Sequence, residues 1–144
     1  MKPYVIGFYG ESNSGKTMLI TEVIKSLSEE GFNVASVKIS DKQIGIDAEG
    51  KDTWKHAKAG SKLVVFSTGR ETDVIIKQKM SYKEINNFIN YVGKYDVVIV
   101  EGANDKVTPK VRLGNISERE NTIMTYNNEF EKLITLIKSH IRRN

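Results

Sequence analysis

The sequence contains no cysteine, which excludes disulfides, thiolate metal sites and cysteine nucleophiles. Long apolar runs are also missing, because no segment stays apolar over the length that a membrane-spanning helix needs. The first residues show no signal-peptide pattern. We therefore expect a cytoplasmic protein with no membrane attachment.

Basic blocks interleaved with aromatic residues are absent as well, although the net charge is +4. This predicts a solvated surface with a modest lysine excess and no nucleic-acid partner, while a basic balance suits phosphate-rich ligands. The chain has 144 residues of mixed composition. That length predicts a single domain over residues 1–144 with a real core.

What the sequence does contain is a phosphate-binding loop at residues 10–17, which matches G-x-x-x-x-G-K-[ST] without a mismatch. An apolar run leads into the loop and a helical apolar pattern leads out of it, which is the expected context for this motif. The residues predicted to bind a nucleotide are Gly10, Ser12, Asn13, Ser14, Gly15, Lys16 and Thr17.

The residue types in the loop explain its chemistry. The glycines allow a sharp turn that brings backbone N–H groups close to an anion, and the following helix directs its positive end to the same place. Lys16 supplies a mobile charge for the β- and γ-phosphates, and Thr17 offers a hydroxyl to Mg²⁺. The motif therefore predicts a nucleoside triphosphate and magnesium as ligands.

Strand and helix patterns alternate along the chain, which predicts a three-layer α/β P-loop NTPase domain. Its sheet should be mostly parallel with helices on both faces, and a short turn near residue 70 should add one antiparallel hairpin. The expected strands are 4–9, 34–39, 63–67, 73–77, 96–101, 109–113 as a short edge strand, and 122–126. The expected helices are 16–30, 52–60, 82–91 and 129–141.

A P-loop needs an acid to help hold magnesium, usually at the end of another buried strand. Glu101 ends the apolar strand of residues 96–101 and is predicted to be a metal ligand and catalytic group, whereas Asp96 begins that strand. Asp47 lies in the polar loop after the second strand and is predicted to contact magnesium or orient the attacking water. Asp52 fits the same role or that of a helix N-cap.

A base-reading tetrapeptide of the Asn/Thr-Lys-x-Asp type is missing. Asn127 and Asn128 follow the last expected strand, where base contacts often occur in parallel sheets. The same two residues also fit a turn and an N-cap before the last helix, so both interpretations stay open.

Several stretches together resemble the molybdopterin-guanine dinucleotide biosynthesis protein B (MobB) family. They are the P-loop, the Gly50-Lys-Asp-Thr-Trp-Lys-His-Ala-Lys-Ala-Gly60 segment, residues 96–102 and the Pro109-Lys110 pair. The match covers most of the chain in order and spacing, and the Gly-Lys-Asp-Thr-Trp run is more specific than the P-loop.

The resemblance implies a homodimeric GTP-binding protein with weak Mg²⁺-dependent GTPase activity. It also implies partners, namely the molybdopterin guanylyltransferase and molybdopterin-handling proteins. Asp47 matches the family's loop acid and Glu101 its acid before glycine. The chain departs from the family where histidines often follow the lysine at Lys38, because residues 39–43 contain none.

Two other functions are compatible with the same motif. A small-molecule kinase would share the fold, but the chain shows no arginine-rich lid and is short for a phosphoacceptor pocket. A non-hydrolysing adaptor would bind nucleotide only to hold a partner. Turnover with and without candidate acceptors separates these possibilities from a slow GTPase.

Overall fold

The computed structural model describes residues 2–141. Its contacts divide the chain into two compact units. Unit 1 contains the described residues of Met1–Ser40 and Asn86–Asn144, and unit 2 is Asp41–Ile85. The single domain expected over residues 1–144 stays a prediction.

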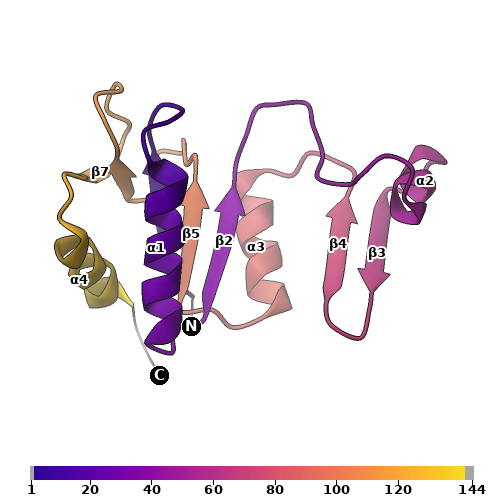
Figure 1. The fold of residues 1–144 in the computed structure, drawn as a ribbon, viewed down its shortest axis with the longest axis horizontal. Helices are drawn as coiled ribbons and strands as arrows, with labels where there is room; N and C mark the ends of the chain where they lie inside the picture. The colour runs from indigo at the N-terminus through magenta and orange to yellow at the C-terminus, as the bar shows by residue number, and fades with distance from the viewer. Residues whose placement is uncertain (1, 142–144) are drawn as a thin grey trace. The chain divides into compact units, whose positions relative to one another are not determined.

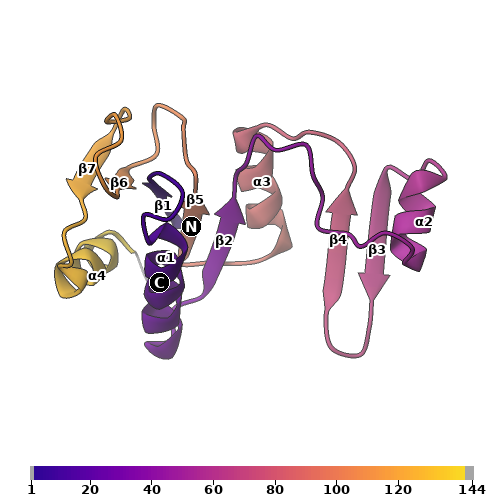
Figure 2. The same cartoon turned by 45° about the horizontal axis from the view of Figure 1, so that its top comes forward.

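Unit 1 is built on a five-stranded sheet in the order β2-β5-β1-β6-β7 (Figures 1 and 2). All its pairings are parallel, as expected from the continuous apolar run of residues 97–100 in the strand β5. The strands are β1 (Tyr4–Tyr9), β2 (Val34–Lys38), β5 (Val97–Glu101), β6 (Lys110–Arg112) and β7 (Thr122–Thr125).

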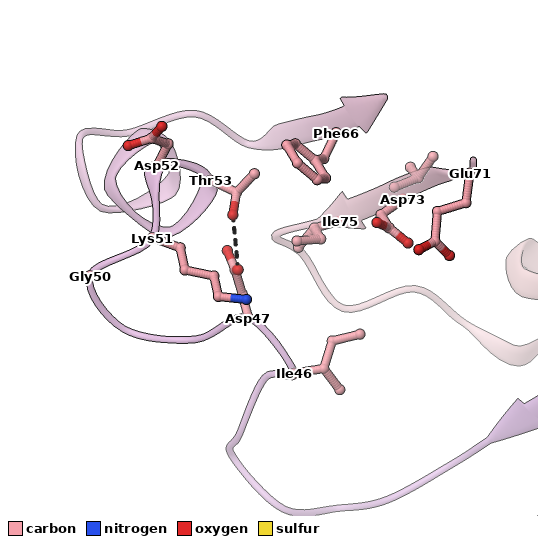
Figure 3. Close-up of a pocket in the computed structure, with 11 residues that line it drawn as sticks. Ile46, Asp47, Gly50, Lys51, Asp52, Thr53, Phe66, Glu71, Asp73 and Ile75 are labelled. Atoms are coloured by element: carbon pink, nitrogen blue, oxygen red, sulfur yellow. Dashed lines mark hydrogen bonds between the residues drawn. The ribbon is translucent and has the colours of Figure 1, made fainter. Parts of the chain in front are cut away.

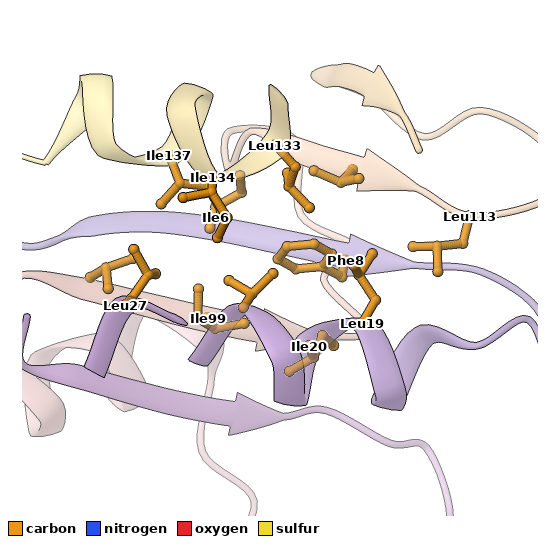
Figure 4. Close-up of a cluster of buried hydrophobic side chains, with 13 residues drawn as sticks. Ile6, Phe8, Leu19, Ile20, Leu27, Ile99, Leu113, Leu133, Ile134 and Ile137 are labelled. Carbon is orange, nitrogen blue, oxygen red and sulfur yellow. The ribbon is translucent and has the colours of Figure 1, made fainter. Parts of the chain in front are cut away.

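The core of unit 1 lies between this sheet and two helices, α1 (Lys16–Glu29) and α4 (Phe130–His140). Ile6 and Phe8 of β1 are fully buried against them, and Figure 4 shows their side chains between the two helices. Helix α3 (Tyr82–Val92) spans the boundary between the units and buries none of its residues.

Unit 2 contains helix α2 (Asp52–Lys58) and an antiparallel hairpin of β3 (Leu63–Ser67) and β4 (Thr72–Ile76), which confirms the predicted hairpin. All expected helices and strands are present, with ends that shift only slightly. The predicted fold class, a mostly parallel α/β sheet with helices and one antiparallel pair, is confirmed.

One expectation about the sheet is wrong. Residues 109–113 were expected to form an edge strand, but β6 lies between β1 and β7. Lys110 is fully buried there, because its ammonium donates to the carbonyl oxygens of Thr108 and Glu120, both at 2.8 Å. A charged residue is tolerated in an interior strand when its donors are satisfied in this way.

No helix within residues 2–141 is long and apolar enough to cross a bilayer.

Candidate nucleotide-binding site

The P-loop connects β1 to α1 at the carboxyl end of the sheet's central strand. Asn13 and Gly15 have positive φ angles of 65° and 85°, which turn successive backbone groups toward one side. A Cβ atom on Gly10 would lie 2.8 Å from the carbonyl oxygen of Leu113, so this glycine lets the loop pack tightly on the strand end. The loop therefore makes the sharp turns expected of the motif, and phosphate binding by its backbone stays a prediction.

Two side chains within the loop fit a phosphate ligand. Ser14 Oγ is buried and, among the described residues, has no hydrogen-bond partner. Lys16 folds back so that its ammonium donates to the carbonyl oxygen of Gly10 at 3.1 Å. A buried hydroxyl without a partner is costly, and a bound phosphate oxygen would satisfy it.

The first predicted metal ligands come together in the structure. Thr17 Oγ1 donates to Glu101 Oε1 at 2.9 Å, which joins the start of α1 to the end of β5. A hydroxyl and one carboxylate are the protein ligands that P-loops usually offer to Mg²⁺, the remaining positions going to phosphate and water. The donor set thus fits magnesium, although no group of three or more metal-ligating acids or histidines occurs within residues 2–141.

A cavity of about 340 Å³ lies at this end of unit 1. Its lining includes most of the loop and both proposed magnesium ligands. Two charged lining residues, Glu11 and Lys38, were not predicted as site residues. Strand register would have been needed to find Lys38, because it enters the cavity only through the pairing of β2 with β5.

Asp47 lies in unit 2. Its Oδ1 accepts a hydrogen bond from Thr53 Oγ1 at 3.0 Å, shown as a dashed line in Figure 3. Its Oδ2 is buried and has no hydrogen-bond partner among the described residues. The contact ties the polar loop to α2, and the role of Asp47 in magnesium binding or catalysis stays a prediction.

Unit 2 has its own cavity of about 720 Å³ beside Asp47 (Figure 3). Its charged lining residues are four acids and one lysine, namely Asp47, Asp52, Glu71, Asp73 and Lys51. Such a lining repels phosphate, so size alone does not make this cavity the triphosphate site.

The capping interpretations of Asp52 and of Asn127 and Asn128 are wrong. Helix α2 has Lys51 as its N-cap and α4 has Glu129, and neither helix has a side-chain cap. Asn127 and Asn128 are exposed, and the described residues offer their side chains no hydrogen-bond partner. Asn128 instead adopts a positive φ of 57°, which asparagine tolerates in a turn. Base contact by these two amides stays a prediction.

The family model for molybdopterin guanine dinucleotide synthesis protein B matches residues 5–139. The chain belongs to this family. The predicted resemblance to MobB proteins is therefore confirmed, and the match includes the P-loop, Asp47 and Glu101.

Two curated relatives are similar over part of their length. A Haemophilus influenzae molybdopterin-guanine dinucleotide biosynthesis adapter protein is 29% identical over 115 residues, which are 76% of this chain and 62% of that protein. A Methanocaldococcus jannaschii protein, provisionally named as such an adapter, is 33% identical over 100 residues, which are 68% of this chain and 40% of that protein. The chain thus spans less than two thirds of either relative.

Solved structures of MobB proteins share the fold. The crystal structure of Bacillus subtilis MobB superposes with a TM-score of 0.77 at 17% identity, over 97% of this chain and 99% of that one. A MobB homologue from Bacillus stearothermophilus gives a TM-score of 0.69 at 15% identity, over 95% and 99% of the two chains. At such identities the likeness establishes the fold alone.

Proposed function

We propose that this protein is a GTP-binding adapter in molybdopterin guanine dinucleotide synthesis, with weak Mg²⁺-dependent GTPase activity. The hydrogen bond between Thr17 and Glu101 carries the proposal, because it sets a hydroxyl and a carboxylate together beside the P-loop. Family membership supports the pathway, and the family's description names a guanine dinucleotide, which favours GTP over ATP.

The residues divide the work of binding. Backbone N–H groups of the loop and the Lys16 ammonium hold the phosphates, and the Ser14 hydroxyl gains the partner that it lacks. Thr17 and Glu101 would hold magnesium, which neutralises charge on the β- and γ-phosphates. Asp47 is proposed to join the metal or the attacking water, at the cost of its hydrogen bond from Thr53.

Slow hydrolysis is expected because the cations that line the site are lysines. Within residues 2–141, the lining of the unit 1 cavity includes lysines and no arginine. Arg112 donates to Thr125 and Ile116, and Arg119 donates to Ala103 and lies over the ring of Tyr9. P-loop proteins without an arginine at the γ-phosphate turn over at roughly 10⁻⁴ to 10⁻² per second.

A homodimer is supported by the hairpin of unit 2. Val65 lies directly opposite Val74, and Leu63 is on the same face of the hairpin. These three side chains are 55%, 44% and 57% exposed, an apolar surface that a two-stranded sheet cannot cover by itself. We propose that a second copy of the chain covers it, and that the guanylyltransferase is the adapter's partner enzyme.

Sedimentation of the full chain tests the dimer. The wild type is expected to sediment as a dimer and Val65→Asp as a folded monomer, because a buried charge opposes association. Lys77→Asp changes an exposed residue next to the hairpin and is the matched control. If the wild type is a monomer at micromolar concentration, the proposed dimer is contradicted, and the proposed nucleotide site is not.

Calorimetry with GTP and ATP, in the presence and absence of Mg²⁺, tests the nucleotide. We expect GTP to bind more tightly than ATP and Lys16→Ala to lose at least about 100-fold in GTP affinity, because a charge-assisted phosphate contact disappears. Lys25→Ala on the exposed side of α1 removes the same charge and should bind normally. Equal GTP affinity in the wild type and Lys16→Ala would refute the site.

A further inference from the structure

Lys38 is the last residue of β2, and the parallel pairing places it directly beside Glu101 of β5. Residues two apart in a strand share a face. Val34 packs against the core that α1 covers, so Lys38 leaves the sheet on the α1 side. Glu101 leaves on the same side, because its carboxylate reaches Thr17 of α1. The ammonium of Lys38 and the carboxylate of Glu101 therefore share one face of the sheet.

The backbone next to Lys38 is fixed against the end of β5. The N–H of Ile39 donates to the carbonyl oxygen of Glu101 at 2.9 Å. Gly102 has a φ of 88°, and a Cβ there would lie 2.6 Å from the carbonyl oxygen of Ile39. Only glycine allows so close an approach at that angle. The two strand ends thus hold Lys38 and Glu101 at neighbouring positions of the same cavity.

The side chain of Lys38 is available to a ligand. It lines the cavity of about 340 Å³ together with Lys16, Thr17 and Glu101, and it is exposed. Among the described residues it has neither a hydrogen bond nor an ion pair. Lys16, in contrast, already donates to the loop carbonyl of Gly10. The cavity therefore contains two lysines. Lys16 belongs to the loop that follows β1, and Lys38 ends β2, on the other side of β5 and its Glu101.

The position of a bound triphosphate follows from the loop and the metal ligands. A P-loop holds the β-phosphate within its backbone, and magnesium bridges β- and γ-phosphate oxygens. Since Thr17 and Glu101 would hold that metal, the γ-phosphate of a bound triphosphate would lie near the ends of β5 and its outer neighbour β2. Lys38 lies at this place, because it is the last residue of β2.

We propose that Lys38 contacts the γ-phosphate and acts as a catalytic cation in hydrolysis, in the role that an arginine has in other P-loop proteins. The inference rests on the proposed nucleotide site. Water attacks the γ-phosphorus, the bond to the β,γ-bridging oxygen breaks, and its electron pair stays on the departing diphosphate. The water's proton passes to the released phosphate and solvent, while Lys38 remains protonated and stabilises the negative charge on the transferred group.

Lys38→Met tests the role, because it keeps the length of the side chain and removes the charge. We expect its affinity for a non-hydrolysable GTP analogue to fall about 10-fold while GDP affinity stays within about twofold. Single-turnover hydrolysis should slow by about 10- to 100-fold. Lys38→Arg should keep most of both properties, and Lys25→Met is the matched control, since it removes the same charge from an exposed face of α1.

The outcomes separate this inference from the proposed function. If the Lys38→Met variant binds the analogue and hydrolyses GTP like the wild type, the role of Lys38 is overturned. The proposed P-loop site is then unaffected. Equal losses of affinity for GDP and for the analogue would also overturn the role of Lys38. GDP has no γ-phosphate, so the loss of a γ-phosphate contact cannot weaken its binding. A wild type that binds no nucleoside triphosphate would overturn both. Thermal unfolding of each variant confirms that it is folded.

Discussion

The five-stranded sheet of unit 1 and the hairpin of unit 2 contain equally apolar strands that are buried very differently. In β5 the residues Val97, Val98, Ile99 and Val100 are all buried. In β3 only Val64 is buried, while Val65 and Phe66 stay about half exposed. Apolar content therefore predicts a strand, but the number of neighbouring strands and covering helices decides whether it is buried.

The difference assigns separate tasks to the two units. Unit 1 has a continuous core and holds the P-loop, Glu101 and Lys38 on rigid strand ends. Unit 2 has an apolar hairpin face that is exposed within residues 2–141, and an acid-rich cavity. We therefore expect changes in the sheet of unit 1 to alter folding and phosphate chemistry, and changes on the hairpin of unit 2 to alter association.

The largest expected contrast is in the cores. Leu133→Ala in α4 removes a fully buried side chain and should lower the free energy of unfolding by about 3 to 4 kcal/mol. Val65→Ala in the hairpin should cost less than about 1 kcal/mol in the monomer, since the side chain is half exposed. Urea unfolding of both variants, at a protein concentration low enough to keep the chain monomeric, measures the two losses. Similar losses would show that the hairpin is as well packed as the sheet.

A smaller effect is expected at Lys110. Lys110→Ala removes the donor from the buried carbonyl oxygen of Thr108 and from the partly buried one of Glu120, and should cost about 3 kcal/mol. Lys77→Ala in unit 2, at an exposed lysine, should change stability by less than about 0.5 kcal/mol. Thermal unfolding compares the two. A Lys110→Ala protein as stable as the wild type would mean that the buried ammonium contributes nothing net.

Substitution of the two predicted catalytic acids, one in each unit, compares the contributions of the units to hydrolysis. Glu101→Gln should slow single-turnover GTP hydrolysis by about 10- to 100-fold and weaken its magnesium dependence, while GDP still binds. Asp47→Asn should slow hydrolysis and leave GDP affinity nearly unchanged. Thr53→Val removes the hydrogen bond to Asp47 without removing the carboxylate, and it is the control. Wild-type turnover in Asp47→Asn would leave Asp47 as a structural acid of unit 2.

The smallest effect concerns Asp105 in the loop before β6. Burial raises the pKa of its carboxyl, but hydrogen bonds from Thr108 and Val107, together with the charge of Lys110, outweigh burial, and the net pKa is lowered. A lowered pKa in the folded state stabilises the protein above the unfolded pKa, and that stability is lost as pH falls through the folded value.

Asp105→Asn should therefore reduce stability by less than about 1 kcal/mol at neutral pH, because the group is partly screened by solvent. The difference from the wild type should shrink as the pH falls below the ordinary range of an aspartate. Unfolding curves at pH 7 and at acidic pH check this. A difference that grows on acidification would contradict the assigned direction of the pKa shift.

The sequence by itself determined the elements and the loop. Apolar periodicity, glycine and the P-loop spacing act over a few residues, so the helices, the strands, the hairpin and the contact partners Thr17 and Glu101 could be predicted from local patterns. The acid at the end of a buried strand could be placed because parallel strands end at one sheet edge.

The tertiary structure alone decided the order of strands and what that order brings together. β6 is interior because β7, formed after a loop, pairs with it, and Lys110 is buried because distant carbonyl oxygens satisfy its ammonium. Lys38 enters the cavity of unit 1 because β2 pairs with β5, which comes much later in the sequence. Such pairings depend on the free energy of the whole sheet, and no local pattern encodes which strands become neighbours.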